Sequence, residues 1–211
     1  KENNELVSII IPTYGRSAGL HKAIKSVLSQ TYQNIEIIVV DDNDPSSIAR
    51  QSTQDLIDRL DSSLVRYIKH SSNLNGAAAR NTGIKNSRGY YIAFLDDDDE
   101  FEADKLLKQI RFLKKNTQYE CVYNKSRVFI KGSEYHRTNY SKSGNISIDI
   151  LTLKSECYTP SLLFTSSSLK ALSGFDEKLI RHQDYDIILR YLKHGYLMSY
   201  QFRSEEHTSE L

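Results

Sequence analysis

Residues 90–99 read YYIAFLDDDD, and this stretch decides how the chain is expected to fold. An uninterrupted apolar run of strand length is typical of a strand buried on both faces, as in a parallel sheet. Four carboxylates follow the run directly. Adjacent carboxylates repel one another unless a cation or solvent screens them, so the end of this strand is also the first candidate site.

Strands and helices alternate on both sides of this stretch. Apolar runs of strand length lie at residues 6–11, 35–40 and 65–68. Apolar or small residues at helical spacing predict helices over residues 20–28, 48–60, 75–87 and 106–113. The alternation predicts an α/β fold with a mostly parallel central sheet, helices on both faces and right-handed connections.

The pattern loosens after about residue 118. One strand is expected over residues 121–130, a turn at 131–133 and a polar loop over 133–147. A strand at 162–165, a short helix at 167–172 and a helix at 184–194 are expected to follow. Residues 203–211, RSEEHTSEL, resemble the translation of a sequencing adapter and are interpreted as a non-native tail; the alternative is a polar helical tail.

The bulk composition limits the classes of function. The chain has 211 residues, of which 39% are hydrophobic and 26% charged, as in an ordinary globular protein. A net charge of +1 argues against a nucleic-acid partner held by bulk electrostatics. No apolar run approaches the roughly 20 residues of a membrane-spanning helix. The two cysteines lack metal-ligand spacing, which favours reduced thiols and a cytoplasmic location.

Polar residues follow three of the expected strands where each strand ends. In open α/β sheets, ligands bind outside the carboxyl ends of the strands, so these clusters are expected to converge. A hard cation such as Mg²⁺ or Mn²⁺ takes few carboxylates and completes its shell with phosphate oxygens and water. The sequence therefore predicts a site for such a cation. The clusters are Thr13-Tyr14, Asp41-Asp42 and Asp96 to Asp99.

Several of these residues have structural alternatives that the residues alone leave open. Asp41 and Asp42 could accept hydrogen bonds from a base or a ribose, or could cap a turn. Arg80 could pair with a diphosphate or with an aspartate. Asp184 and Asp186 open a helix, where the helix dipole favours carboxylates, and either could instead act as a general base.

The ordered set of motifs resembles a family 2 glycosyltransferase with the GT-A fold. The resemblance spans residues 6 to about 193. It rests on VSIIIPTY (7–14), SQTY (29–32), VDD (40–42), residues 76–84, FLDDDD (94–99), GFDE (174–177) and QDYDIILR (183–190). It implies one GT-A domain over residues 1–202, with a nucleotide-binding part at about 1–100 and an acceptor-side part at about 101–202.

The resemblance also implies roles for individual residues. Asp42 would contact uracil, Asp98 would bind the Mg²⁺ or Mn²⁺, and Asp184 would be the catalytic base of an inverting transfer. The remaining residues implied to bind the nucleotide sugar are Pro12, Thr13, Tyr14, Asp41, Arg80, Asp96 and Asp97. The family often has Glu before the base, where this chain has Gln183, and often Asn where this chain has Gly15.

The expected reaction is transfer of a sugar from a nucleotide diphosphate sugar, expected to be a UDP-sugar, to a saccharide or lipid-linked saccharide acceptor. Cell-surface polysaccharide or glycolipid synthesis, with a peripheral contact at the inner face of the membrane, is expected at the level of the family. One alternative is a sugar-nucleotide nucleotidyltransferase, which would want a Gly-rich basic loop after the first strand. Residues 12–16 supply one Gly and one Arg. The other is a non-catalytic nucleotide-sugar or metal-binding module.

Overall fold

The computed structural model describes residues 5–130 and 133–201. The tail interpreted as non-native, residues 203–211, and residues 131–132 of the expected turn lie outside the described part. Within that part, no helix is both long and apolar enough to cross a membrane.

The N-terminal half alternates between strand and helix as the sequence predicts. Its elements are β1 (Val7–Thr13), α1 (Ser17–Leu28), β2 (Ile35–Asp41), α2 (Ile48–Leu60), β3 (Val65–Lys69), α3 (Gly76–Asn86), β4 (Tyr91–Phe94) and α4 (Lys105–Lys115). The C-terminal half is more irregular. It contains β5 (Cys121–Tyr123), β6 (Arg127–Ile130), β7 (Ser133–Arg137), α5 (Ser147–Leu151), the 3₁₀ turn η1 (Thr159–Ser161), β8 (Leu162–Thr165), α6 (Ser166–Ala171), α7 (Gln183–Lys193) and β9 (Met198–Tyr200).

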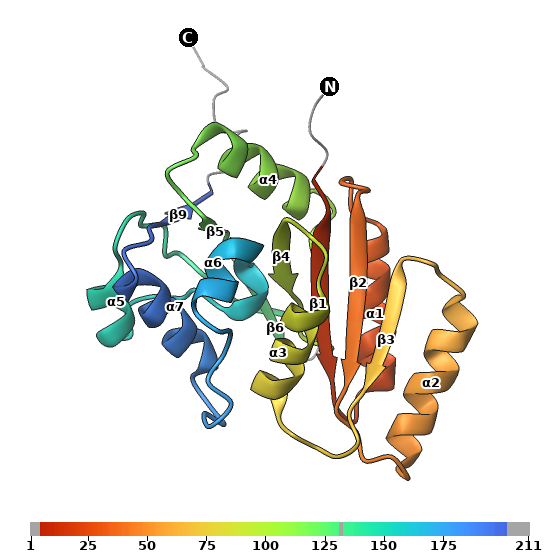
Figure 1. The fold of residues 1–211 in the computed structure, drawn as a ribbon. Coiled ribbons are helices and arrows are strands. Elements are labelled where there is room, and N and C mark those ends of the chain that lie inside the picture. The colour runs from red at the N-terminus through yellow and green to blue at the C-terminus, as the bar shows by residue number, and fades with distance from the viewer. Residues whose placement is uncertain (1–4, 131–132, 202–211) are drawn as a thin grey trace.

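Seven of the described strands form a central sheet in the order β3-β2-β1-β4-β8-β5-β9, and β6 pairs with β7 in a separate two-stranded sheet (Figure 1). β1 pairs in parallel with β2 and β4, and β2 pairs in parallel with β3. β8 runs antiparallel to both of its neighbours, β4 and β5. Because β2, β1 and β4 are parallel neighbours, the polar residues after each of them meet at one edge of the sheet.

Alternation along β1 divides the interior into two cores. Ile9 and Ile11 pack in the core that α1, α2 and α4 cover. Ile10 points to the other face and belongs to the core shared with α3, α5, α6 and α7. Burying an isoleucine side chain stabilises the fold by about 1.5–3 kcal/mol, so both faces of the strand contribute. The expected α/β fold, with a mostly parallel sheet and helices on both faces, is confirmed (Figure 1).

The prediction for residues 121–147 was wrong in two respects. The expected single strand is two strands, because β5 ends at Tyr123 and β6 leaves the central sheet to pair with β7. The expected loop contains β7, and Gly144 forms a bridge with Met198 of β9. The segment SEYHR of β7 lacks apolar alternation, so its strand geometry comes from pairing with β6 rather than from local pattern.

Candidate active site

A cavity of about 450 Å³ opens at the carboxyl edge of β1, β2 and β4. Asp42 and Asp98 both line it, so the polar clusters after β2 and β4 lie close together, as the sequence predicts. Of the residues expected to bind the nucleotide sugar or the metal, all but Asp41 lie on its wall. The lining residues are Pro12, Thr13, Tyr14, Arg16, Asp42, Gly76, Ala79, Arg80, Asp96, Asp97 and Asp98.

The loop before α3 holds the carboxylate of Asp42 in a fixed orientation. The backbone N–H groups of Leu74 and Asn75 donate to its two oxygens at 2.8 and 2.9 Å. His70 Nδ1 lies 2.7 Å from Oδ1 of the same carboxylate. A carboxylate can accept about four hydrogen bonds, so these three leave capacity for one further donor. A nucleobase N–H is a donor of the required kind.

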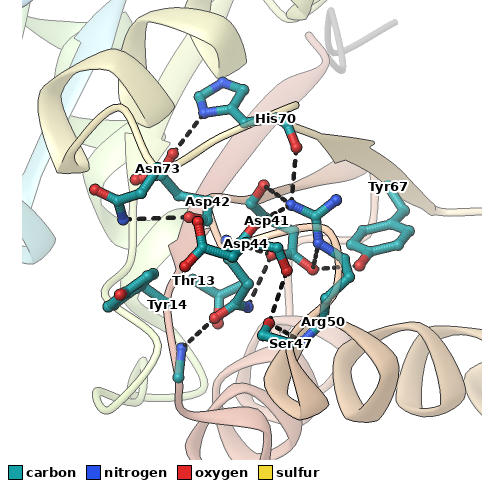
Figure 2. Close-up of polar contacts among 12 residues, drawn as sticks. Thr13, Tyr14, Asp41, Asp42, Asp44, Ser47, Arg50, Tyr67, His70 and Asn73 are labelled. Carbon is teal, nitrogen blue, oxygen red and sulfur yellow. Dashed lines mark hydrogen bonds and ion pairs between the residues drawn. The ribbon is translucent and has the colours of Figure 1, made fainter.

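Asp41 has a different environment from Asp42 (Figure 2). Its side chain is fully buried and forms an ion pair with Arg50, with 3.1 Å between Oδ2 and Nε. It also accepts hydrogen bonds from the backbone and side chain of Asn43 and from the Tyr67 hydroxyl. The expectation that Asp41 contacts the nucleotide is therefore corrected, because its oxygens are committed to the interior. Asp41 stabilises the end of β2 instead.

Asp97 ties the loop after β1 to the acidic run. Its Oδ2 accepts a hydrogen bond of 2.7 Å from the Thr13 hydroxyl and one of 3.2 Å from the backbone N–H of Tyr14. Burial raises the pKa of Asp97, although these hydrogen bonds oppose the shift. Asp97 and Thr13 thus hold each other in place, and the Asp97 carboxylate fixes the position of the cavity wall formed by Thr13 and Tyr14.

Two other carboxylates of the run, Asp96 and Asp98, have cationic partners. Asp96 Oδ1 lies 2.6 Å from Arg80 Nη2, and Asp98 Oδ2 lies 2.5 Å from Arg16 Nη1. Asp99 is exposed, yet desolvation within the loop and repulsion from its acidic neighbours raise its pKa to about 6. The crowding of negative charge makes this edge of the sheet a favourable place for a cation.

The donor set fits a cation that the substrate helps to hold. Across residues 5–130 and 133–201, no group of three or more His, Cys, Asp or Glu side chains is placed to hold a metal by itself. Mg²⁺ is usually bound by one or two carboxylates together with substrate phosphates, and not by a protein cage. The side chain of Asp98 is 56% exposed and shares the cavity with Arg80, so one carboxylate and a diphosphate can meet there.

Asp184 lies in a second, larger cavity of about 1600 Å³. The two cavities share Asp96 and Asp98, so Asp184 faces the space next to the acidic run. Asp186, the other candidate base, is paired with Arg190 at 2.7 Å. The same guanidinium donates to the backbone oxygens of residues 172 and 174, so Asp186 serves the packing of α7. Of the two carboxylates, Asp184 lines the cavity and Asp186 is held by an arginine.

Sequence reasoning missed three contacts that shape the site. Arg80 Nη1 donates to Gln183 Oε1 at 2.8 Å, which ties α3 to the first turn of α7. His70 also contacts the Thr82 hydroxyl through Nε2 at 2.8 Å, so both ring nitrogens are engaged. Arg16 forms ion pairs with Asp97 and Asp98 of the acidic run. Gln183 could have been noticed in the sequence, because the family often has Glu at that position. Nothing in the sequence singled out His70.

The fold resembles solved glycosyltransferases. TarS 1–349 of S. aureus superposes with a TM-score of 0.74 and 18% identity, over 95% of this chain and 58% of that chain. The mannosyltransferase PcManGT from Pyrobaculum calidifontis, solved with GDP-Man and Mn²⁺, gives a TM-score of 0.68 and 15% identity, over 96% of this chain and 59% of that chain. The fold is therefore GT-A, the architecture of a class of nucleotide-sugar enzymes.

Sequence comparisons assign the family. The model "Glycosyl transferase family 2" matches residues 8–173. An uncharacterized glycosyltransferase of Haemophilus influenzae is 34% identical over 193 residues, which is 90% of this chain and 73% of the relative. The chain belongs to glycosyl transferase family 2.

Two further relatives match shorter segments. The glucosyltransferase WfaP of Escherichia coli, named for UDP-Glc and α-D-GlcNAc-diphosphoundecaprenol, is 41% identical over 109 residues, 52% of this chain and 41% of the relative. An uncharacterized glycosyltransferase of Rickettsia conorii is 44% identical over 131 residues, 59% of this chain. The match spans only 21% of that longer protein.

Proposed function

We propose that the chain transfers a sugar from a nucleotide diphosphate sugar, a UDP-sugar, to an acceptor hydroxyl with inversion at the anomeric carbon. One observation carries this proposal. Asp42 and Asp98 line one cavity, and Asp184 lines a second cavity that shares Asp96 and Asp98 with the first. The residues proposed as nucleobase contact, metal ligand and base therefore line adjoining cavities, which supports a donor and an acceptor that lie next to each other.

The first cavity is the proposed donor site. Asp42 accepts a hydrogen bond from the base, Arg80 contacts the diphosphate, and Asp96 contacts the ribose or the sugar. Pro12, Thr13 and Tyr14 form the wall beside the nucleotide, and Asp97 positions that wall. TarS has been crystallised with UDP and with UDP-GlcNAc, which supports a uridine nucleotide in a fold of this kind.

Asp98 is the proposed protein ligand of Mg²⁺ or Mn²⁺. When bound, the cation neutralises the charge that develops on the leaving diphosphate. The Mn²⁺ in the structure of PcManGT with GDP-Man supports a divalent ion in this fold. Arg80 supplies a second positive charge beside the same phosphates, and its pairing with Asp96 and Gln183 fixes its direction.

Asp184 is the proposed general base. Its carboxylate takes the proton from the acceptor hydroxyl while the oxygen attacks the anomeric carbon from the face opposite the diphosphate. The larger cavity offers room for a saccharide or lipid-linked saccharide. The names of WfaP and of the amylovoran and colanic acid proteins AmsB and WcaA support a role in polysaccharide or glycolipid synthesis.

The test is release of nucleoside diphosphate from a panel of UDP- and GDP-sugars, with Mn²⁺ and with EDTA. A glycosyltransferase releases UDP from one donor, and the release rises when acceptor saccharides are added. Pyrophosphate formed from a nucleoside triphosphate and a sugar phosphate would instead identify a nucleotidyltransferase. Saturable donor binding without release or transfer, with any acceptor, would identify a binding module.

A further inference from the structure

Arg16 bridges two carboxylates of the acidic run. Its Nη1 lies 2.5 Å from Asp98 Oδ2 and 3.4 Å from Asp97 Oδ1. Asp97 is buried and held by Thr13, whereas the side chains of Arg16 and Asp98 are 58% and 56% exposed. The guanidinium therefore sits at the open end of the run and is anchored mainly through the contact with Asp98.

The backbone around Arg16 is held by a contact of its own, whereas its side chain is exposed. Gly15 adopts a φ of +77°, a conformation that favours glycine, and its N–H donates to Asn43 Oδ1 at 2.7 Å. This contact holds the loop between β1 and α1 against the end of β2. A long, exposed side chain on a fixed backbone can change rotamer without moving the loop.

We propose that Arg16 is an internal counter-ion that occupies the cation position at Asp98, so that a divalent ion must displace it to bind. This inference rests on the proposed role of Asp98 as the metal ligand. A Mg²⁺ ligand oxygen lies about 2.0–2.1 Å from the ion, and the guanidinium already contacts that oxygen. The two positive charges also repel each other at such distances, so they compete for Asp98.

The competition predicts a modest and measurable effect. An exposed ion pair contributes about 0.2–1 kcal/mol, which corresponds to a factor of up to about fivefold in a binding constant. Removing the guanidinium should therefore strengthen metal binding by about two- to fivefold. A lysine at the same position keeps the cation and should leave the affinity close to that of the unchanged protein.

The experiment titrates MnCl₂ into the protein at one saturating concentration of UDP and measures free Mn²⁺ by electron paramagnetic resonance, with the Mn²⁺ that the same UDP binds without protein subtracted. Arg16→Ala is expected to bind Mn²⁺ about two- to fivefold more tightly, and Arg16→Lys to bind as the unchanged chain does. Arg111→Ala is the matched control, because Arg111 is an exposed arginine on α4 that lines neither cavity. It removes the same charge and should leave the affinity unchanged.

Equal or weaker Mn²⁺ binding by Arg16→Ala, with Asp98→Asn weaker than both, would overturn the inference about Arg16 alone. If Asp98→Asn binds Mn²⁺ as tightly as the unchanged chain, Asp98 is not the metal ligand, and the proposed role of Asp98 is refuted. If Arg111→Ala gains the same factor in Mn²⁺ affinity, the effect comes from the change in net charge and not from the position of Arg16. That result would also overturn the inference.

Discussion

Asp184 and Asp186 stand two residues apart in the first turn of α7, yet their surroundings give them different tasks. Asp184→Asn keeps the size of the side chain and removes its ability to take a proton. We expect turnover to fall by about 10²–10⁴-fold while UDP affinity stays unchanged. Steady-state rates and calorimetric UDP binding check this. Asp186→Asn is the control, because loss of its pair with Arg190 should lower stability more than turnover.

A loss of UDP affinity in Asp184→Asn equal to the loss of rate would contradict the role of general base. It would place Asp184 in the donor site instead.

Glu36 is a buried carboxylate at the opposite edge of the sheet. Burial alone would raise its pKa, but the Ser8 hydroxyl, the Arg88 N–H and the Arg66 guanidinium outweigh burial and lower it. Because the folded-state pKa is below the unfolded value, this stabilisation is complete above about pH 4.5 and is lost as the pH falls through the folded-state pKa.

Glu36→Gln should therefore lower the free energy of unfolding by about 1–3 kcal/mol at pH 7. The difference from the unchanged protein should shrink as the pH falls below about 4.5. Urea unfolding of both proteins at several pH values between 7 and 3 measures it. A difference that stays constant across this range would show that the charge of Glu36 does not contribute.

At the scale of elements, α3 depends on a close approach to β1. A Cβ built on Gly83 would lie 2.3 Å from Cγ2 of Ile10, a side chain that is itself fully buried. Alanine favours a helix over glycine by about 1 kcal/mol, but overpacking a core costs about 1–3 kcal/mol. We expect Gly83→Ala to destabilise the fold and, because α3 carries Arg80, to weaken UDP binding as well.

Thermal unfolding and UDP titration test this prediction. Lys85→Ala, an exposed change on the same helix, is the control and should alter neither quantity. Higher stability of Gly83→Ala would mean that β1 and α3 can separate without cost.

At the scale of the whole molecule, the sequence predicted the elements that local periodicity determines, and the prediction failed where partners are remote. Strands such as β1 and β4 are continuous apolar runs, and their polar ends meet because parallel neighbours share an edge. β7 has no such pattern and exists because β6 pairs with it. Asp41 and Asp42 are identical and adjacent in sequence. Only the fold could show that Asp41 pairs with Arg50, whereas Asp42 lines the cavity.

Ligand linkage gives a prediction for the molecule as a unit, because a donor bound between β1, β2 and β4 stabilises the folded state alone. At a UDP concentration 100 times its Kd, the stabilisation is about 2.7 kcal/mol. For a domain of this size, 1 kcal/mol raises Tm by about 2–4 °C, so UDP with Mn²⁺ should raise Tm by about 5–10 °C. The shift should be clearly smaller in EDTA. In Asp98→Asn the two shifts should be equal, since no cation joins the protein to the diphosphate. An EDTA-insensitive shift in the unchanged protein would show that Arg80 holds the diphosphate without a metal.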